Sequence, residues 1–398
     1  MRHFKTFSLL ALFAFCSLSL SAQQVVKGEI TDVEKHETYT PSFENDGADR
    51  KPVNVILMIG DGMGLAHLSA GMYANGGELT ITNLQTCGWS RTQSASDFTT
   101  DSAASGTAYA CGQKTFNGAI GVDVDKNPIA NLPEKLAKHG IVSGIVTTDD
   151  LGGATPSAFF AHQPSRNMKP EIWADLADAA IIFFAGGKWE DYEKQDEKTV
   201  KAIEDRYYVT NTLDTRKASK AKRLGYLPYG EVTASKSEGR GDFLPSSTSY
   251  AIDFLQSRAS DGFFLMVEGG RIDYACHDND ATATFGEIND LNASVQLALD
   301  FYERHPDETL IIVTSDHETG GMIVGYKKYK VRLDRLAWQN ISMESLTRVM
   351  QRMREEGKTD WDDMQALLKE RLGLWDKVTL RDKDEKALRK TFEKNFLV

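Results

Sequence analysis

The sequence predicts an α/β fold, a doubly wound and mostly parallel sheet flanked by helices. Short apolar runs rich in β-branched residues recur along the chain, and each has the length of a strand buried in a parallel sheet. Segments with apolar residues at helical spacing separate these runs. Strands that alternate with helices in this way imply one sheet with helices on both faces.

The individual elements can be placed from the same patterns. The first expected strand covers residues 53–59 and ends at the glycine-rich turn Gly60-Asp61-Gly62-Met63-Gly64. The clearest helix is expected over 287–304, where apolar residues such as Ile288, Leu291 and Val295 lie on one side. The other expected strands cover residues 141–148, 180–185, 263–267 and 309–314.

The two ends of the chain differ from this pattern. Residues 1–22 combine a basic start, an apolar run and small residues before the expected cleavage near Ala22, which is typical of a secretory signal peptide. The apolar run is short for a spanning helix, and the residues before Cys16 do not fit a lipoprotein site, so no membrane anchor is expected. We therefore expect a periplasmic or secreted protein with one catalytic domain over 23–398, in which residues 326–398 form a charged helical tail.

The composition excludes some classes of function. The 398 residues carry a formal net charge of −11 without a basic stripe, which argues against nucleic acid as a partner. Removal of Cys16 with the leader leaves Cys87, Cys111 and Cys276, an odd number that excludes a disulfide scaffold and leaves one bridge open. Because Cys276 lies beside His277, a metal-ligand role is a second reading of this thiol.

The run Asp101-Ser102-Ala103-Ala104 predicts a helix that begins at Ser102. The amino end of a helix offers N–H groups and a positive dipole to an anion such as a phosphate group. A serine hydroxyl becomes a good nucleophile only with a base or a metal ion beside it. An ordinary N-capped helix would show the same pattern, so the run alone does not decide between the two readings.

Acidic and imidazole residues gather where the expected strands end. Ligands bind outside the carboxyl ends of the strands in open α/β sheets, so these side chains are expected to converge. Imidazole with carboxylate suits zinc, and an all-oxygen set suits magnesium. With Ser102, the cluster predicts metal-assisted phosphoryl transfer. Its members are Asp61, Glu268, Asp273, His277, Asp316 and His317.

Several motifs in the same order resemble those of the alkaline phosphatases, over most of the chain after the leader. They lie at residues 54–64, 97–121, 154–156, 161–162, 165–166, 263–277 and 311–317. The resemblance implies hydrolysis of small phosphate monoesters, with Ser102 as the nucleophile that becomes transiently phosphorylated. It also implies that the guanidinium of Arg166 binds two phosphate oxygens in a bidentate manner and that Asp101 orients this arginine.

The resemblance further implies two zinc ions and one magnesium ion. One zinc would activate the serine oxygen, and the other would stabilise the leaving oxygen and later present hydroxide. The matching ligands are Asp61, Asp316 and His317 for the first zinc, Asp273 and His277 for the second, and Asp61, Thr155 and Glu268 for magnesium.

The chain departs from the family pattern at three places. Gly153 stands where the family has an aspartate or histidine near magnesium, so we expect weaker activation by magnesium. Tyr274 stands where members have lysine or histidine. The family supplies a third histidine to the second zinc from a late segment beyond a variable insertion that residues 326–398 resemble. No histidine follows His317 here, so the second zinc site is expected to be incomplete and the 398-residue form poorly active.

Two alternatives of different classes stay open from the sequence. One is a phosphodiesterase of the same superfamily, although those enzymes more often use a threonine nucleophile. The other is a catalytically impaired protein that binds metal or phosphate without turnover. The sequence does not identify the physiological substrate, and it leaves open whether the chain forms a homodimer.

Overall fold

The computed structural model describes residues 37–38, 51–228, 236–325, 331 and 333–397. At its centre lies a seven-stranded parallel sheet with the strand order β4-β5-β3-β2-β6-β1-β7. The expected signal peptide lies outside the described residues. The strands are β1 Asn54–Gly60, β2 Val142–Thr147, β3 Phe183–Ala185, β4 Tyr208–Thr210, β5 Leu224–Tyr226, β6 Phe263–Gly269 and β7 Thr309–Ser315.

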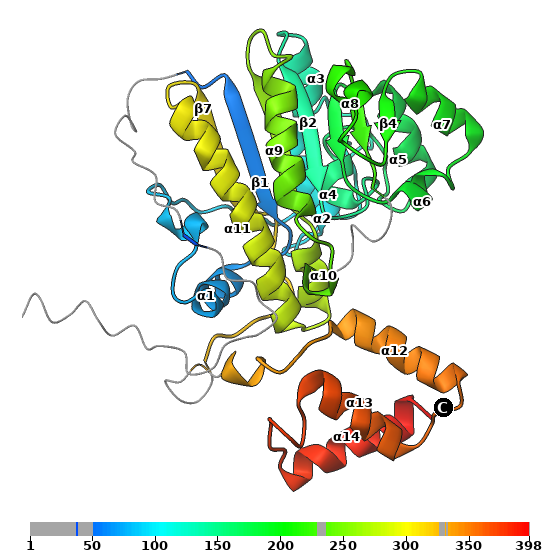
Figure 1. Cartoon of the computed structure of the whole chain (residues 1–398). Helices are drawn as coiled ribbons and strands as arrows, with labels where there is room; N and C mark the ends of the chain where they lie inside the picture. Colours follow the sequence, from blue (N-terminus) through cyan, green and yellow to red (C-terminus); the bar gives the residue numbers. More distant parts are fainter. Residues whose placement is uncertain (1–36, 39–50, 229–235, 326–330, 332, 398) are drawn as a thin grey trace, which may run out of the picture.

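Helices cover both faces of this sheet, as the sequence predicts (Figure 1). Alternate side chains of β1 point to opposite faces: Ile56 and Met58 pack with one core cluster, and Leu57 and Ile59 pack with the other. The first cluster includes residues of α9 (Phe243–Gln256), α10 (Arg271–His277) and α11 (Ala281–Arg304). The second includes residues of α2 (Ser102–Cys111), α4 (Ala154–Ser157), α5 (Lys169–Asp175) and α7 (Glu197–Glu204).

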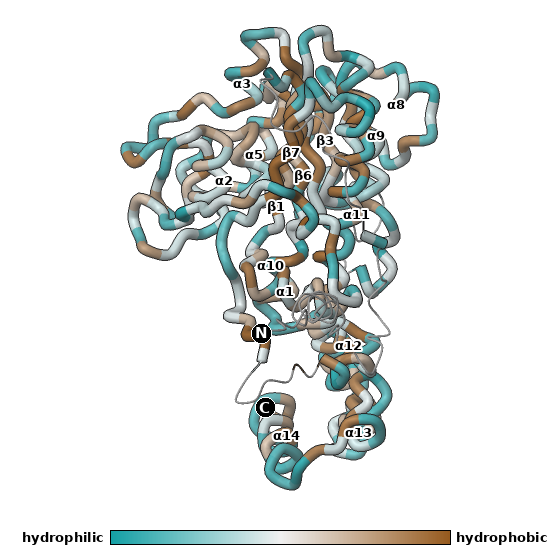
Figure 2. The backbone as a smooth tube through the Cα atoms, turned by 90° about the vertical axis from the view of Figure 1, so that its left-hand side faces the viewer, coloured by the Kyte–Doolittle hydropathy of each residue, from teal (hydrophilic) through white to brown (hydrophobic). Residues whose placement is uncertain are grey.

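The remaining helices are shorter or lie at the edges of this core. Figure 2 shows the hydrophobic strands at the centre of the molecule, with more hydrophilic segments around them. No helix among the described residues is long and apolar enough to cross a membrane. The shorter helices and those at the edges of the core are α1 Leu65–Ala74, η1 Thr80–Asn83, α3 Leu132–Ala137, η2 Leu176–Asp178, α6 Trp189–Tyr192, α8 Arg216–Lys220, η3 Lys236–Glu238 and η4 Leu333–Arg335.

Each of the five expected strands coincides with an observed strand; β2 is one residue shorter at each end than expected, and β3 is shortened most. The expected start of β3 lies at residue 180, whereas the observed strand begins at Phe183. The carbonyl of Ile181 accepts hydrogen bonds from the Tyr207 hydroxyl (2.8 Å) and the Arg223 guanidinium (2.8 Å) instead of a neighbouring strand. Side chains distant in sequence therefore displace the start of the strand.

Helix α11 begins six residues before the expected start. Asp280 caps it, because its carboxylate accepts a hydrogen bond from the backbone N–H of Ala283 (3.1 Å). The same carboxyl group accepts hydrogen bonds from the Gln339 side chain (2.7 Å) and the Met343 backbone N–H (2.8 Å). The cap therefore also joins the main domain to the segment that leads into α12.

The expected helical tail consists of α12 (Met343–Glu355), α13 (Trp361–Leu372) and α14 (Asp382–Asn395). These helices lie beyond α10 in Figure 1 and share a small core of their own. Glu238 attaches the tail to the main domain by accepting hydrogen bonds from the backbone N–H of Ser342 (3.0 Å) and the hydroxyl of Ser345 (2.6 Å). The buried members of the tail core are Leu346, Met364, Leu368, Phe392 and Phe396.

The loop that carries Arg166 is held in place by His162. The ring of His162 bonds to the carbonyl of Gly121 through Nδ1 (2.7 Å) and to the carboxylate of Glu134 through Nε2 (2.9 Å). Burial disfavours the charged ring, but these two hydrogen bonds and the charge of Glu134 outweigh it, so the pKa of His162 is raised from 6.5. The backbone N–H of Arg166 also donates a hydrogen bond to the carbonyl oxygen of Gly118 (2.7 Å), which lies in the same loop as Gly121.

We predict a pH-dependent stability difference between the parent and His162→Gln. A raised histidine pKa contributes stability that is present below about pH 6.5 and is lost as the pH rises through the folded-state pKa. The variant should therefore be less stable by about 1 kcal/mol at pH 6, and the difference should shrink towards pH 9. Denaturant unfolding across this range measures it, and a difference that grows with pH would contradict the assignment.

Candidate active site

The parallel register of four neighbouring strands brings the predicted acids together. Thr147 at the end of β2 is the register partner of Glu268 in β6, and Gly60 at the end of β1 is the partner of Ser315 in β7. The residues that follow these last two strands are Asp61 and Asp316. The strand ends therefore form one row, and the expected convergence at the carboxyl edge of the sheet is confirmed.

Asp61, Asp316 and His317 form the densest cluster. One ligand atom from each of the three residues lies within 4.8 Å of the other two. Asp316 is fully buried, and its Oδ1 accepts hydrogen bonds from the backbone N–H groups of Gly62 (3.0 Å) and His317 (3.0 Å). The structure therefore brings together all three ligands that the sequence predicts for one zinc ion.

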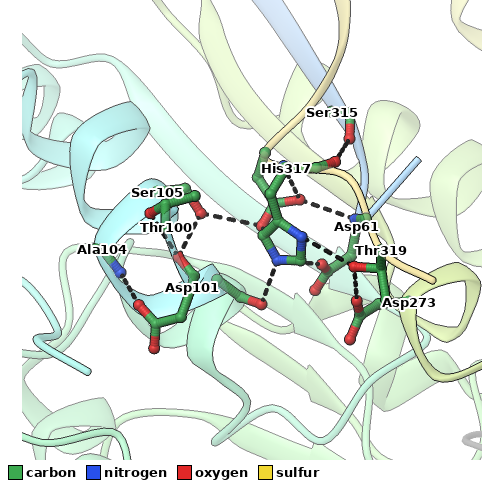
Figure 3. A network of polar contacts seen from close by, with 12 residues as sticks. Asp61, Thr100, Asp101, Ala104, Ser105, Asp273, Ser315, His317 and Thr319 are labelled. Atoms are coloured by element: carbon green, nitrogen blue, oxygen red, sulfur yellow. Dashed lines mark hydrogen bonds and ion pairs between the residues drawn. The ribbon is translucent and has the colours of Figure 1, made fainter. Parts of the chain in front are cut away.

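Ser102 faces this cluster from the first turn of α2. Its Oγ lies 2.9 Å from Nε2 of His317, and the side chain is almost fully buried. Asp101 caps the helix by accepting a hydrogen bond from the backbone N–H of Ala104 (3.0 Å; Figure 3). The predicted nucleophile therefore lies at a capped helix N-terminus and beside a predicted zinc ligand.

Ser105 is a site residue that the sequence analysis missed. It lies one turn after Ser102 on α2, and its hydroxyl lies 3.1 Å from Oδ2 of Asp316 and 2.8 Å from the carbonyl of Asp101 (Figure 3). Helical spacing from Ser102 could have suggested that Ser105 faces the same way. Its acidic partner lies 211 positions away in the sequence, so the contact itself required the fold.

Asp101 also connects α2 to Arg166. Its carboxylate accepts hydrogen bonds from the backbone N–H of Gly118 (3.0 Å) and from Nη1 of Arg166 (3.2 Å). The Arg166 side chain is 40% exposed, so part of the guanidinium stays accessible to a ligand. The structure therefore places Asp101 and Arg166 together, as the resemblance implies.

Asp273 and His277 lie next to the first cluster. Their carboxylate oxygen and Nε2 atoms are 3.4 Å apart across one turn of α10. Thr319, which the sequence analysis missed, donates a hydrogen bond to Asp273 (2.6 Å) and lies 3.1 Å from Nδ1 of His317 (Figure 3). A side chain at Gly62 (φ +63°) would collide with both Thr319 and Asp273. The described part of the chain has no third His, Cys, Asp or Glu grouped with Asp273 and His277.

The predicted magnesium ligands lie on the other side of Asp61. Glu268 and Thr155 are almost fully buried, and Thr147 donates a hydrogen bond to Oε2 of Glu268. The absence of a side chain on Gly106 lets α2 approach Thr155, since a Cβ there would lie 3.1 Å from the Thr155 Cα. Among the described residues, Oδ1 of Asp61, Oγ1 of Thr155 and Oε1 of Glu268 have no hydrogen-bond partner, and Oδ1 of Asp61 lies 3.3 Å from Nε2 of His317.

These oxygens without hydrogen bonds fit a bound cation. Burial and the charge of Asp316 raise the pKa of Asp61, and burial and the charge of Asp149 raise the pKa of Glu268. Buried carboxylates this close repel one another unless positive charge lies between them. A donor set of carboxylate, hydroxyl and imidazole groups is suited to divalent metal ions.

Cys276 does not belong to the site, although it precedes His277. Its thiol lies 3.7 Å from the hydroxyl of Thr284 in the main core, and burial raises its pKa to about 12. The second reading of this thiol, as a metal ligand, is therefore wrong in this structure. Cys87, Cys111 and Cys276 are all free, so the described residues contain no disulfide bridge.

Comparisons with known proteins agree with this geometry. The family model described as alkaline phosphatase matches residues 52–182 and 183–367. Alkaline phosphatase 4 of Bacillus subtilis is 34% identical over 291 residues, which cover 68% of this chain and 62% of that protein. Among the Bacillus subtilis and yeast relatives, the chain spans 58–62% of their length.

Solved structures show the same similarity. The alkaline phosphatase from the Antarctic bacterium TAB5 matches with a TM-score of 0.66 and 35% identity, over 71% of this chain and 83% of that chain. A mutant of that enzyme, which matches with a TM-score of 0.66 and 36% identity over 71% of this chain and 82% of that chain, has Mg bound in the M3 site.

We predict that Asp61→Asn changes stability in opposite directions with and without metal. In the metal-free protein the substitution removes a repelled buried charge, so the unfolding midpoint should rise by about 2–4 °C. In the zinc-loaded protein it removes a ligand, so the midpoint should fall. Thermal unfolding with and without chelator measures both. Asp125→Asn, on an exposed turn, is the charge-matched control, and a shift of the same sign in both conditions would refute a metal role.

Proposed function

The chain belongs to the alkaline phosphatase family, and on that premise we propose that it hydrolyses phosphate monoesters through a phosphoserine at Ser102. The observation that carries the proposal is the contact between the Ser102 hydroxyl and His317, next to buried carboxylate oxygens that lack hydrogen bonds. A serine at a helix N-terminus beside a cation site has both the nucleophile and the charge that phosphoryl transfer needs.

We propose that Asp61, Asp316 and His317 hold one zinc ion and that Asp273 and His277 contribute to a second. Asp61, Thr155 and Glu268 would hold magnesium. When bound, these ions would supply positive charge that lowers the pKa of nearby oxygens and neutralises the phosphate group. The oxygens of Asp61, Thr155 and Glu268 that lack hydrogen bonds support this distribution of ligands.

The side chains of this chain divide the remaining work among them. The exposed part of the Arg166 guanidinium binds two oxygens of the substrate phosphate, and Asp101 keeps the guanidinium oriented. The amino end of α2 adds backbone N–H groups to the same anion. Ser102 is held by α2 so that its oxygen can approach the phosphorus in line with the leaving oxygen.

The reaction then proceeds in two displacements. In the first, the Ser102 oxygen forms a bond to phosphorus, the ester oxygen leaves as an alcohol or phenol, and the serine proton is lost to the surrounding water. In the second, a water molecule attacks the phosphorus of the phosphoserine from the side opposite the Ser102 oxygen. This step breaks the bond between phosphorus and the Ser102 oxygen, releases inorganic phosphate and regenerates the hydroxyl.

We also propose that the chain is exported to the periplasm or secreted. The basic start, apolar run and small residues of the segment 1–22 support this location. The exported protein should begin near Gln23 when its amino terminus is sequenced, whereas a cytoplasmic product that retains Met1 would contradict the proposal.

We predict that Ser102→Ala abolishes labelling of the protein by a phosphate ester and leaves metal content nearly unchanged. Ser102 carries the transferred group, whereas the metal charge is balanced by the carboxylates and imidazoles around it. Rapid-quench labelling with an aryl phosphate measures the first effect, and elemental analysis measures the second. Turnover near the parent rate would show that Ser102 is not the nucleophile.

Turnover measurements separate the phosphomonoesterase from the two alternatives, a phosphodiesterase and a catalytically impaired protein. A mono- and a diester of one phenol should be compared, because a phosphodiesterase would prefer the diester.

Arg166→Lys is the matched variant for phosphate recognition, since it keeps the charge but loses the bidentate geometry. It should weaken inhibition by inorganic phosphate, and an unchanged inhibition constant would contradict the role of Arg166. A parent protein that binds metal and phosphate without turnover would indicate a catalytically impaired member of the family.

A further inference from the structure

Asp149 is a buried carboxylate that the proposed reaction does not use. It lies two residues beyond the end of β2, and its backbone N–H donates a hydrogen bond to Oγ1 of Thr147 (2.8 Å). The same Thr147 hydroxyl donates to Glu268. One threonine therefore holds both the backbone of Asp149 and the side chain of a proposed magnesium ligand.

Two glycines leave room for the Asp149 side chain. A Cβ on Gly153 would lie 2.2 Å from Oδ2 of Asp149, so this carboxylate occupies the space into which a side chain at residue 153 would point. A Cβ on Gly270 would lie 2.8 Å from the Cβ of Asp149 and 3.2 Å from Oε1 of Glu268. The Asp149 side chain and the unpartnered Glu268 oxygen are thus neighbours across Gly270.

Tyr274 fixes the direction of this carboxylate. Its hydroxyl donates a hydrogen bond to Oδ1 of Asp149 (2.8 Å), and the Arg271 guanidinium lies over its ring, 4.4 Å from the ring centroid. The backbone N–H of Arg271 donates to Oγ1 of Thr148 (3.2 Å), which joins α10 to the end of β2. Asp149 is therefore held from its own loop and from α10.

The neighbouring oxygens indicate a ligand at this place. Oε1 of Glu268 and Oγ1 of Thr155 have no hydrogen-bond partner among the described residues, although their side chains are 0% and 1% exposed. The described residues contain no group in which ligand atoms of Asp149, Asp61 and Glu268 all lie within 4.8 Å of one another. Mg²⁺ keeps several of its waters when it binds to proteins, and such waters can reach a more distant carboxylate.

We propose that Asp149 is the outer carboxylate of the magnesium site, where it accepts hydrogen bonds from the waters of a cation held by Asp61, Thr155 and Glu268. Tyr274 acts as the positioning residue of this carboxylate, and Gly153 provides its space. The inference rests on the proposed function, because it takes those three residues as the cation site. It replaces the expectation that glycine at residue 153 leaves magnesium without an acidic partner.

Magnesium affinity tests this role without any measurement of turnover. The zinc-loaded full chain is titrated with MgCl₂ by calorimetry, and Mg²⁺-dependent shifts of the unfolding midpoint are measured in parallel. Loss of an outer partner of a metal site typically weakens binding about 10–100-fold, which we expect for Asp149→Asn. Tyr274→Phe should weaken binding by a smaller factor. The matched control is Asp150→Asn, whose carboxylate faces Gly152 and Lys169, and it should stay within about twofold of the parent.

A swap of the two positions makes the test sharper. Gly153→Asp alone should weaken magnesium binding or stability, because its Cβ meets the Asp149 carboxylate at 2.2 Å. Asp149→Ala combined with Gly153→Asp removes this collision and supplies a carboxylate from the other side. The double variant should bind magnesium more tightly than Asp149→Ala alone.

Three outcomes would overturn the proposal. They are a parent protein without saturable Mg²⁺ binding, a folded Asp149→Asn variant within about twofold of the parent, or a folded double variant without recovery. If Asp149→Asn does not fold, Tyr274→Phe and the double variant still decide. Repeating the titration in a Ser102→Ala background separates this result from the proposed function, because that variant is expected to bind metal without turnover.

Discussion

The repulsion among carboxylates buried at one edge of the sheet is the constraint on which the site depends. Asp61, Glu268 and Asp316 lie at or just after the ends of three neighbouring parallel strands, and parallel pairing leaves them no freedom to separate. In an apolar interior such charges are stable only with protons or cations between them. The cations that we propose would therefore also stabilise the fold, and burial with neighbouring negative charges raises the pKa values of Asp61 and Glu268 in the metal-free chain.

A layer of hydroxyl groups organises this charge. Ser105 contacts Asp316, Thr147 donates to Glu268, Thr319 donates to Asp273, and Tyr274 donates to Asp149. Each hydroxyl comes from a different segment of the chain than the acid that it contacts, so each acid is oriented by a second side chain. A hydroxyl can donate to a carboxylate without adding charge, which leaves the remaining lone pairs of the acid free for a metal ion or its waters.

The sequence predicted those parts of the site that local pattern encodes. Asp61 and Asp316 follow apolar runs, and Ser102 follows a capping aspartate, so their places at strand and helix ends could be recognised. Ser105, Thr319 and Asp149 could not, because their roles depend on partners brought close by the sheet order. The strands β4 and β5 were missed because three residues are too few to show an alternating pattern. The middle residue of β5 is Gly225, which is poor evidence for a strand, and the Phe184 ring occupies the place where a Cβ would lie.

The helical tail contacts residues that lie next to the candidate site. Arg271, whose guanidinium stacks on Tyr274, forms an ion pair with Glu344 in the first turn of α12. Arg271 therefore contacts both the tail and the residue that orients Asp149. The backbone N–H of Arg271 also donates a hydrogen bond to Thr148 at the end of β2, so one residue contacts the tail, Tyr274 and this strand end. The proposed ligands Asp61, Glu268 and Asp316 therefore lie at strand ends, whereas the proposed outer carboxylate is oriented by a residue of α10.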